Sequence, residues 1–271
     1  LRLAANRCRR FQRRYQDGEK TTDARSVGNG LEGSATCGLV LRGGQQYTGG
    51  MLQQRTIPGG WRDETVEIAG RRFDLLLPAS PDDVFYHLEH HPEAAADLGH
   101  DPYWAQLWPT SRKLAETLLS GSQTWSGTAI ELGCGVGLVG LAAATLGMQV
   151  TFSDYNPLAV ELALENARRN GFSQATGLVL DWRDPPAQTF DAILASDVIY
   201  DRKLHQPLLN TLAQLSHANS TIWIGDGGRS ATEEFVAEAQ ANWKLQIVDF
   251  DGHPRPDIHV GSYRRLSFQR K

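Results

Sequence analysis

The sequence predicts an α/β fold in which a seven-stranded, mostly parallel sheet carries helices on both faces. Three observations predict it. A short apolar strand over residues 128–132 runs into three alternating glycines and then into an Ala- and Leu-rich helix over residues 136–146. Apolar, strand-like stretches alternate with helical periods along the rest of the chain. Several of these strands end in an aspartate, which gathers carboxylates at one edge of a parallel sheet.

Composition limits the classes of function. The chain has 271 residues, 41% of them hydrophobic, which suffices for one packed domain with an extension. A net charge of −4 argues against a general binder of nucleic acid. The three cysteines are not spaced as a metal site, so we expect no metal and a reduced, cytoplasmic compartment. No apolar run reaches membrane-spanning length.

Residues 1–60 form a basic, Gly-rich segment that we expect to be a disordered extension. They hold ten Lys and Arg against four Asp and Glu, whereas residues 61–271 hold 17 against 27. A basic arm for an acidic partner and an Arg-rich targeting peptide are the alternatives. Residues 61–271 are expected to form the folded domain, whose acidic balance suits a basic protein substrate as well as ordinary solubility.

The folded domain is predicted to begin with a β-hairpin over residues 64–78. Apolar residues alternate on both sides of Ala69-Gly70, as in two strands joined by a turn. A short helix from Val84 to His91 follows, with Ser80 as its N-cap. The histidines of this helix lack the partners of a metal site and are expected at the surface.

Two tryptophans precede the next helix. Trp104 and Trp108 lie between Pro102 and Pro109, and Pro109 can begin a helix that continues to Leu119. We expect one of the two indoles to anchor the core.

Glu131 stands just before the glycines and narrows the choice of ligand. Gly135-x-Gly137-x-x-Gly140 also matches the fingerprint of dinucleotide-binding proteins, so the glycines alone leave a nicotinamide enzyme open. A carboxylate at position 131 would repel a pyrophosphate but attract an ammonium or a sulfonium group. The turn is therefore predicted to face a cationic ligand.

Acidic residues end the strands that follow. Strands are expected over residues 149–153, 176–180 and 190–200, and they carry Asp154, Asp181 and Asp197 at or near their ends. A carboxylate in the place of Asp154 can bind both hydroxyls of an adenosine ribose. Asn156 and Pro157 open a helix that stops at Gly171.

The remaining chain is predicted to complete the sheet. Helices are expected over residues 203–215 and 230–242, strands over 221–225, 244–248 and 263–269, and a long connection over 251–256. His205 is expected on the surface of the first of these helices.

Three motifs make the sequence resemble a known family. Glu131-x-Gly133-x-Gly135-x-Gly137 is similar to the first motif of class I, Rossmann-like S-adenosylmethionine-dependent methyltransferases. Asp197-Val-Ile-Tyr200 resembles the motif after the fourth strand of the seven-β-strand protein lysine methyltransferases. Pro102-Tyr-Trp-Ala-x-x-Trp-Pro109 is similar to a segment of the electron-transfer-flavoprotein β-subunit lysine methyltransferase branch. The resemblance covers residues 64–271.

The resemblance implies S-adenosylmethionine as cofactor and a protein with an exposed lysine as substrate. Asp197 and Tyr200 would be catalytic, with Asp197 holding the incoming amine. The cofactor would be bound by Trp108, Glu131, Gly133, Gly135, Gly137, Asp154, Asn156, Asp181, Trp182 and Ser196. In this scheme Asp154 binds the ribose, Asp181 accepts a hydrogen bond from the adenine amino group, and Trp182 stacks on the ring.

Other functions stay open at this point. The chain has no Asn/Asp-Pro-Pro-Tyr stretch and no Pro-Cys pair, which argues against methyl transfer to nucleic-acid bases. A small-molecule methyltransferase is an alternative, because the sequence does not show the pocket walls. A nicotinamide-dependent oxidoreductase explains the glycines and Asp154 but not Asp181 or Tyr200. A non-catalytic cofactor-binding scaffold is the remaining alternative.

Overall fold

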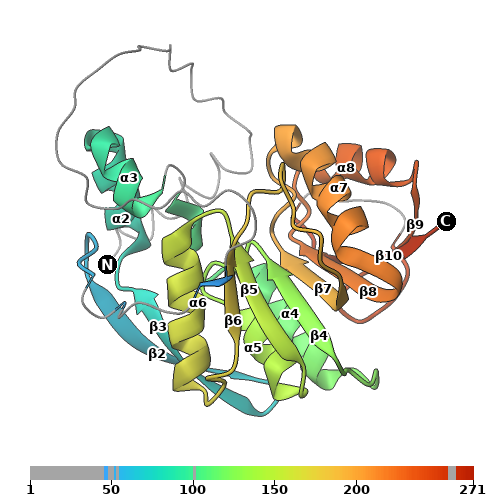
Figure 1. Cartoon of the computed structure of the whole chain (residues 1–271), viewed down its shortest axis with the longest axis horizontal. Helices are drawn as coiled ribbons and strands as arrows, with labels where there is room; N and C mark the ends of the chain where they lie inside the picture. The colour runs from blue at the N-terminus through green and yellow to red at the C-terminus, as the bar shows by residue number, and fades with distance from the viewer. Residues whose placement is uncertain (1–45, 48–51, 53–54, 100–101, 256–260) are drawn as a thin grey trace.

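A mostly parallel sheet whose strand order reverses about its central strand organises the chain (Figure 1). The computed structural model describes residues 46–47, 52, 55–99, 102–255 and 261–271. The strands of this sheet are β1 (Gln46–Tyr47), β4 (Thr128–Leu132), β5 (Gln149–Asp154), β6 (Thr176–Val179), β7 (Phe190–Ser196), β8 (Ser216–Asp226), β9 (Trp243–Val248) and β10 (Arg264–Arg270). Their order is β1-β6-β5-β4-β7-β8-β10-β9. Strands β4 to β8 pair in parallel, whereas β10 runs antiparallel to both of its neighbours.

The predicted fold is confirmed, with one addition at the edge of the sheet. Seven strands form the expected sheet, and the two-residue strand β1 pairs antiparallel with β6. This strand falls in the segment expected to be disordered, and Leu52 and Ile57 of the same segment are buried. Part of the segment thus packs on the domain. Residues 1–45, 48–51 and 53–54 of the segment lie outside the described residues, so the expectation of disorder stays a prediction for them.

Helices cover both faces of the sheet, and the side chains of each strand alternate between them. One face carries α4 (Pro109–Ser120), α5 (Leu138–Thr145) and α6 (Pro157–Arg169), and the other carries α7 (His205–Leu215) and α8 (Thr232–Ala239). In β4, Ala129 packs into the first layer, while Ile130 and Leu132 pack into the second. Among the described residues, every helix is too short or too polar to cross a bilayer.

A separate hairpin lies outside this layered body. Strands β2 (Trp61–Ile68) and β3 (Arg71–Pro78) pair antiparallel, and β3 lies along α6 (Figure 1). Helix α2 (Pro81–His90) follows, and Ser80 caps it by accepting from the Asp83 N–H at 3.3 Å. Both elements confirm the prediction. The short helices α3 (Ala95–Leu98) and η3 (Pro102–Ala105) lead from α2 toward α4.

The prediction for His205 is wrong. Its side chain is only 2% exposed, at the start of α7. The imidazole packs edge-on against Phe235 of α8, with 5.2 Å between ring centroids. Burial between two helices 30 residues apart is a tertiary effect that helical spacing alone does not reveal. Of the three histidines predicted to lie on the surface here, His90 and His91 are exposed and His87 is half-buried.

The arrangement of the strands fixes where a ligand can bind. Strand β4 lies between β5 and β7, and Leu132 at its end pairs with both Ser153 and Ala195. The ends of these three strands therefore lie level at one edge. Ligands of open α/β sheets bind beyond the carboxyl ends of the strands, at the point where the strand order reverses. That point is the end of β4, where the glycines begin.

Candidate functional site

The turn after β4 adopts a backbone that only glycine tolerates well. Gly133, Gly135 and Gly137 all have positive φ, at 62°, 50° and 83°. A Cβ on Gly133 would lie 2.9 Å from Val198 Cγ1 and 3.8 Å from Trp182 Cζ2. The turn thus lies directly against the residues that follow β6 and β7, and one side chain from each of these two segments lies next to Gly133.

Glu131 lies beneath this turn. Its side chain is 1% exposed, and Oε2 accepts a hydrogen bond of 2.8 Å from the Gly140 N–H in the first turn of α5. Burial raises the pKa of the Glu131 carboxyl to about 8, although the N–H groups of Gly140 and Val139 oppose the shift. Glu131 therefore braces the start of α5. Its direct contact with a cofactor stays a prediction.

Asp154 and Asn156 also bind the backbone around the turn. Asp154 accepts from the Gly135 N–H at 3.0 Å and from the Asn156 N–H at 2.9 Å, and burial raises its pKa. Asn156 caps α6 by accepting from the Leu158 N–H and donates to the Leu98 carbonyl at 2.7 Å. Asp154 is thus next to the turn, as predicted, while the Asn156 side chain serves as a helix cap. Neither predicted contact with the cofactor is tested.

Asp181 and Trp182 follow β6 at the same edge. Arg183 donates hydrogen bonds to both oxygens of Asp181, from Nη2 to Oδ2 at 2.6 Å and from Nε to Oδ1 at 2.8 Å. These bonds lower the Asp181 pKa. Trp182 is half-buried, and its Cζ2 lies 3.8 Å from the place that a Cβ on Gly133 would take. The indole is therefore well placed to cover a ligand on the turn, whereas Asp181 already has a cationic partner.

Asp197 ends β7 in a strained conformation. Its φ is +56°, which is uncommon for a residue other than glycine, and it is 7% exposed. Burial raises its pKa, and Arg229, Thr110 and the Gly227 N–H oppose that shift. The Arg229 Nη2 lies 3.3 Å from Asp197 Oδ1. Ser196 precedes it, half-buried, and pairs with Gly225 of β8.

A group of aromatic rings lies next to Arg229, the partner of this carboxylate. Tyr103 lies 5.7 Å from Tyr200, 6.2 Å from Trp108 and 5.5 Å from Phe85, measured between ring centroids. The guanidinium of Arg229 lies 5.5 Å from the Trp108 ring centroid. We call Tyr103, Trp108, Tyr200 and Phe85 the aromatic cluster. It gathers residues from α2, η3, the N-cap of α4 and the segment that follows β7.

The structure separates the roles of the two tryptophans. Trp104 is 5% exposed and donates from Nε1 to the Leu98 carbonyl at 2.9 Å, so it anchors the core. Trp108 is half-buried, donates to the Tyr103 carbonyl at 3.0 Å and presents a face to Arg229. This is the division that the sequence predicts, with Trp108 as the functional candidate.

Sequence reasoning missed Arg229, Thr110 and Tyr103. All three contact predicted site residues. A signal was available for Arg229, because Asp226 ends β8, the strand next to β7 in the sheet, and Gly227-Gly228 then place the following side chain at the same edge. The structure thus forms two adjoining groups: the glycine turn with Glu131 and Asp154, and Asp197 with the aromatic cluster. They meet where Gly133 contacts Val198.

The model of one protein family matches residues 103–242, more than half of the chain, and that family is described as lysine methyltransferase. The chain belongs to the lysine methyltransferase family. The matched residues include Trp108, the glycine turn, Asp197 and Arg229. This lysine methyltransferase uses S-adenosylmethionine as its cofactor.

Individual relatives agree with the family match. Protein N-lysine methyltransferase METTL21A of Xenopus tropicalis is 30% identical over 195 residues, covering 69% of this chain and 88% of the relative. The METTL21A protein of Danio rerio is 32% identical over 166 residues, covering 58% and 75%. These relatives do not test the narrower likeness to the electron-transfer-flavoprotein branch, which stays a prediction.

A solved structure supports the fold alone. The PH0226 protein of Pyrococcus horikoshii OT3 superposes with a TM-score of 0.50 at 15% identity, over 68% of this chain and 99% of that protein.

The crowding at Gly137 predicts an unequal cost for two glycine substitutions. A Cβ on Gly137 would lie 2.8 Å from Ala163 Cβ, whereas one on Gly147, just beyond the other end of α5, would meet open space. Both residues have positive φ. Gly137→Ala should lower the free energy of unfolding by about 3 kcal/mol and Gly147→Ala by about 1 kcal/mol, as measured by urea denaturation. Equal losses would contradict the predicted crowding.

The raised pKa of Glu131 predicts a dependence of stability on pH. The folded pKa of about 8 lies above the ordinary 4.5, so the folded state favours the protonated carboxyl. The associated stability is complete below pH 4.5 and is lost as the pH rises through 8. Glu131→Gln keeps an oxygen acceptor for the Gly140 N–H and removes the titrating carboxyl group. Relative to this variant, the wild type should lose free energy of unfolding between pH 5 and pH 8, and a constant difference would refute the prediction.

Proposed function

We propose that this lysine methyltransferase modifies an exposed lysine of a protein, whose side chain enters between the rings of the aromatic cluster and reaches Asp197. One observation carries the proposal. The nearly buried carboxylate of Asp197 directly precedes Val198, which lies against the glycine turn, and its partner Arg229 lies over the Trp108 ring of the aromatic cluster. Aromatic faces and a carboxylate are the groups that recognise an alkylammonium ion.

The residues around the turn fit the cofactor. Side chains are excluded at Gly133 and Gly137, so the backbone can approach a ligand closely. The Trp182 ring lies beside Gly133, and Asp154 lies beside Gly135. We therefore propose Gly133, Gly135, Gly137, Asp154 and Trp182 as its main contacts.

Other predicted cofactor residues would act less directly. Glu131 would act by bracing the turn that it already binds, and Asn156 by capping α6. The fit of Asp181 would require it to share its carboxylate with Arg183. Ser196 and Trp108 would border the cofactor from the Asp197 side.

The chain's own residues would prepare the amine for transfer. When bound, the cofactor supplies a methyl group that its sulfonium already activates. A lysine amine has an ordinary pKa near ~10.4, so it must lose a proton before it can act as a nucleophile. Asp197 would accept a hydrogen bond from Nζ and orient its lone pair, and Tyr200 and Trp108 would hold the alkyl chain and keep water out. Arg229 lowers the Asp197 pKa against the effect of burial and so favours the charged carboxylate.

We also propose a cytoplasmic location and a protein partner as substrate. The buried, unpaired thiol of Cys134 beside the glycine turn supports a reducing compartment.

The decisive experiment is labelling of a host lysate with tritiated S-adenosylmethionine, followed by mass spectrometry of the labelled protein. Methyl groups on lysine Nζ support the proposal, while label in small molecules or nucleic acid overturns it. Calorimetry with S-adenosylhomocysteine and with NAD tests the cofactor separately. Binding of the first and not the second is expected.

Loss of the Asp197 charge should slow turnover strongly and spare cofactor binding. Asp197→Asn keeps the size of the side chain, so about a hundredfold loss of kcat is expected, with an S-adenosylhomocysteine Kd close to that of the wild type. Asp184→Asn, at an exposed position after β6, is the control. Wild-type kcat in Asp197→Asn would remove Asp197 from the mechanism.

The ion pair of Arg229 predicts a shifted pH profile. The Arg229 charge lowers the Asp197 pKa against the effect of burial. In Arg229→Gln that pKa rises, so the acid limb of kcat against pH should move to higher pH. Arg202→Gln, which removes an exposed pair with Glu234, should leave the limb in place. An unmoved limb in Arg229→Gln would show that Asp197 is not the titrating group.

A further inference from the structure

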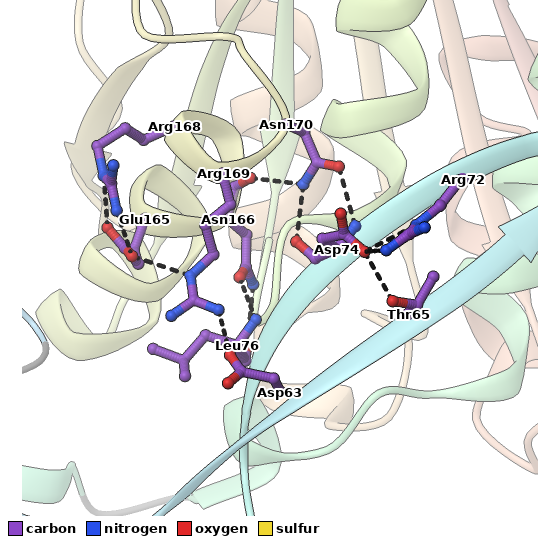
Figure 2. Close-up of polar contacts among 10 residues, drawn as sticks. All are labelled: Asp63, Thr65, Arg72, Asp74, Leu76, Glu165, Asn166, Arg168, Arg169 and Asn170. Atoms are coloured by element: carbon purple, nitrogen blue, oxygen red, sulfur yellow. Dashed lines mark hydrogen bonds and ion pairs between the residues drawn. The ribbon is translucent and has the colours of Figure 1, made fainter.

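Two asparagines, Asn166 of α6 and Asn170 at its C-cap, hold the hairpin in the same way (Figure 2). Asn170 accepts from the Asp74 N–H at 3.0 Å and donates to the Asp74 carbonyl at 2.9 Å. Asn166, one helical turn earlier, accepts from the Leu76 N–H at 2.7 Å and donates to the Leu76 carbonyl at 3.2 Å. A carboxamide carries a donor and an acceptor like a peptide group, so α6 pairs with the free edge of β3 as a strand would.

The second amide proton distinguishes the two asparagines. Asn170 donates this proton to the Asn166 carbonyl of the preceding helix at 2.7 Å. Asn166 donates it to the Val136 carbonyl at 2.9 Å. Val136 lies inside the glycine turn, between Gly135 and Gly137. Asn166 is 0% exposed, so both of its donor bonds form away from water.

Further contacts hold the hairpin against the helices that flank the turn. Arg169 of α6 pairs with Asp63 of β2, and Arg112 of α4 pairs with Glu64 of β2 at 2.9 Å. These pairs are exposed or half-exposed and therefore contribute little individually. The buried amide of Asn166 is the contact that joins the hairpin to the turn itself.

We propose that Asn166 is a positioning residue for the cofactor: it holds the Val136 carbonyl and thereby couples the position of the hairpin to the shape of the glycine turn. Loss of the Asn166 amide removes the hydrogen bond to the Val136 carbonyl, and the glycine turn then samples conformations that do not bind the cofactor. This inference concerns cofactor binding and holds whichever acceptor receives the methyl group. Its failure and the failure of the proposed lysine substrate are therefore seen in different experiments.

The test compares Asn166→Ala with Asn170→Ala. Each variant removes two hydrogen bonds to β3, and only the first also releases Val136. Both should lower Tm. Asn166→Ala should raise the S-adenosylhomocysteine Kd about tenfold, and Asn170→Ala should change it less than about twofold. In steady-state assays, Asn166→Ala should raise KM for S-adenosylmethionine with kcat nearly unchanged. Equal Kd changes in the two variants, or a wild-type Kd in Asn166→Ala, overturn the proposal.

A measurement on the wild type keeps the test decisive if Asn166→Ala does not fold. Coupling between two sites is reciprocal. S-adenosylhomocysteine should therefore slow hydrogen exchange at the Leu76 amide, which Asn166 binds, more than at the Asp74 amide, which Asn170 binds. Equal protection of both amides refutes the coupling through Asn166.

Discussion

Burial of carboxyl groups at one edge of a parallel sheet is the constraint on which the rest of this structure depends. Glu131 and Asp154 lie at the ends of β4 and β5, and Asp197 and Asp226 at those of β7 and β8. Burial raises the pKa of each, for Asp226 to about 6. Backbone N–H groups and Arg229 offset part of that cost. Both reactants of a lysine methyltransferase, a sulfonium and an ammonium, are cations, and a cation beside these carboxyl groups favours their charged forms.

Much of the architecture follows from local sequence. The hairpin shows alternating apolar residues, α2 has Ser80 as its cap, and glycines follow β4. Each of these local patterns predicts its structure without knowledge of the rest of the chain. Parallel pairing then brings Asp154 and Asp197 to one edge, because strand ends align. This is why the approximate place of the site follows from the spacing of acids and glycines.

The sequence does not reveal which side-chain atoms already have hydrogen-bond or ion-pair partners within the protein. Glu131 lies where predicted, yet its carboxyl accepts a hydrogen bond from the Gly140 N–H, and the carboxylate of Asp181 is paired with Arg183. Arg229 reaches Asp197 from a loop more than 30 residues later. His205 is buried by a helix that follows it at a similar distance. Such contacts depend on how separate elements pack, which no local pattern records.

The short strand β1 has a consequence for the handling of the chain. Strand β6 would otherwise end the sheet, and Gln46 and Tyr47 cover its outer edge beside Leu178 and Gly177. An uncovered edge is a template on which strands of other molecules can add. A protein trimmed to begin at residue 61 would lack β1 and the buried Leu52 and Ile57 and would present that bare margin, so its colloidal behaviour would differ from that of the longer chain.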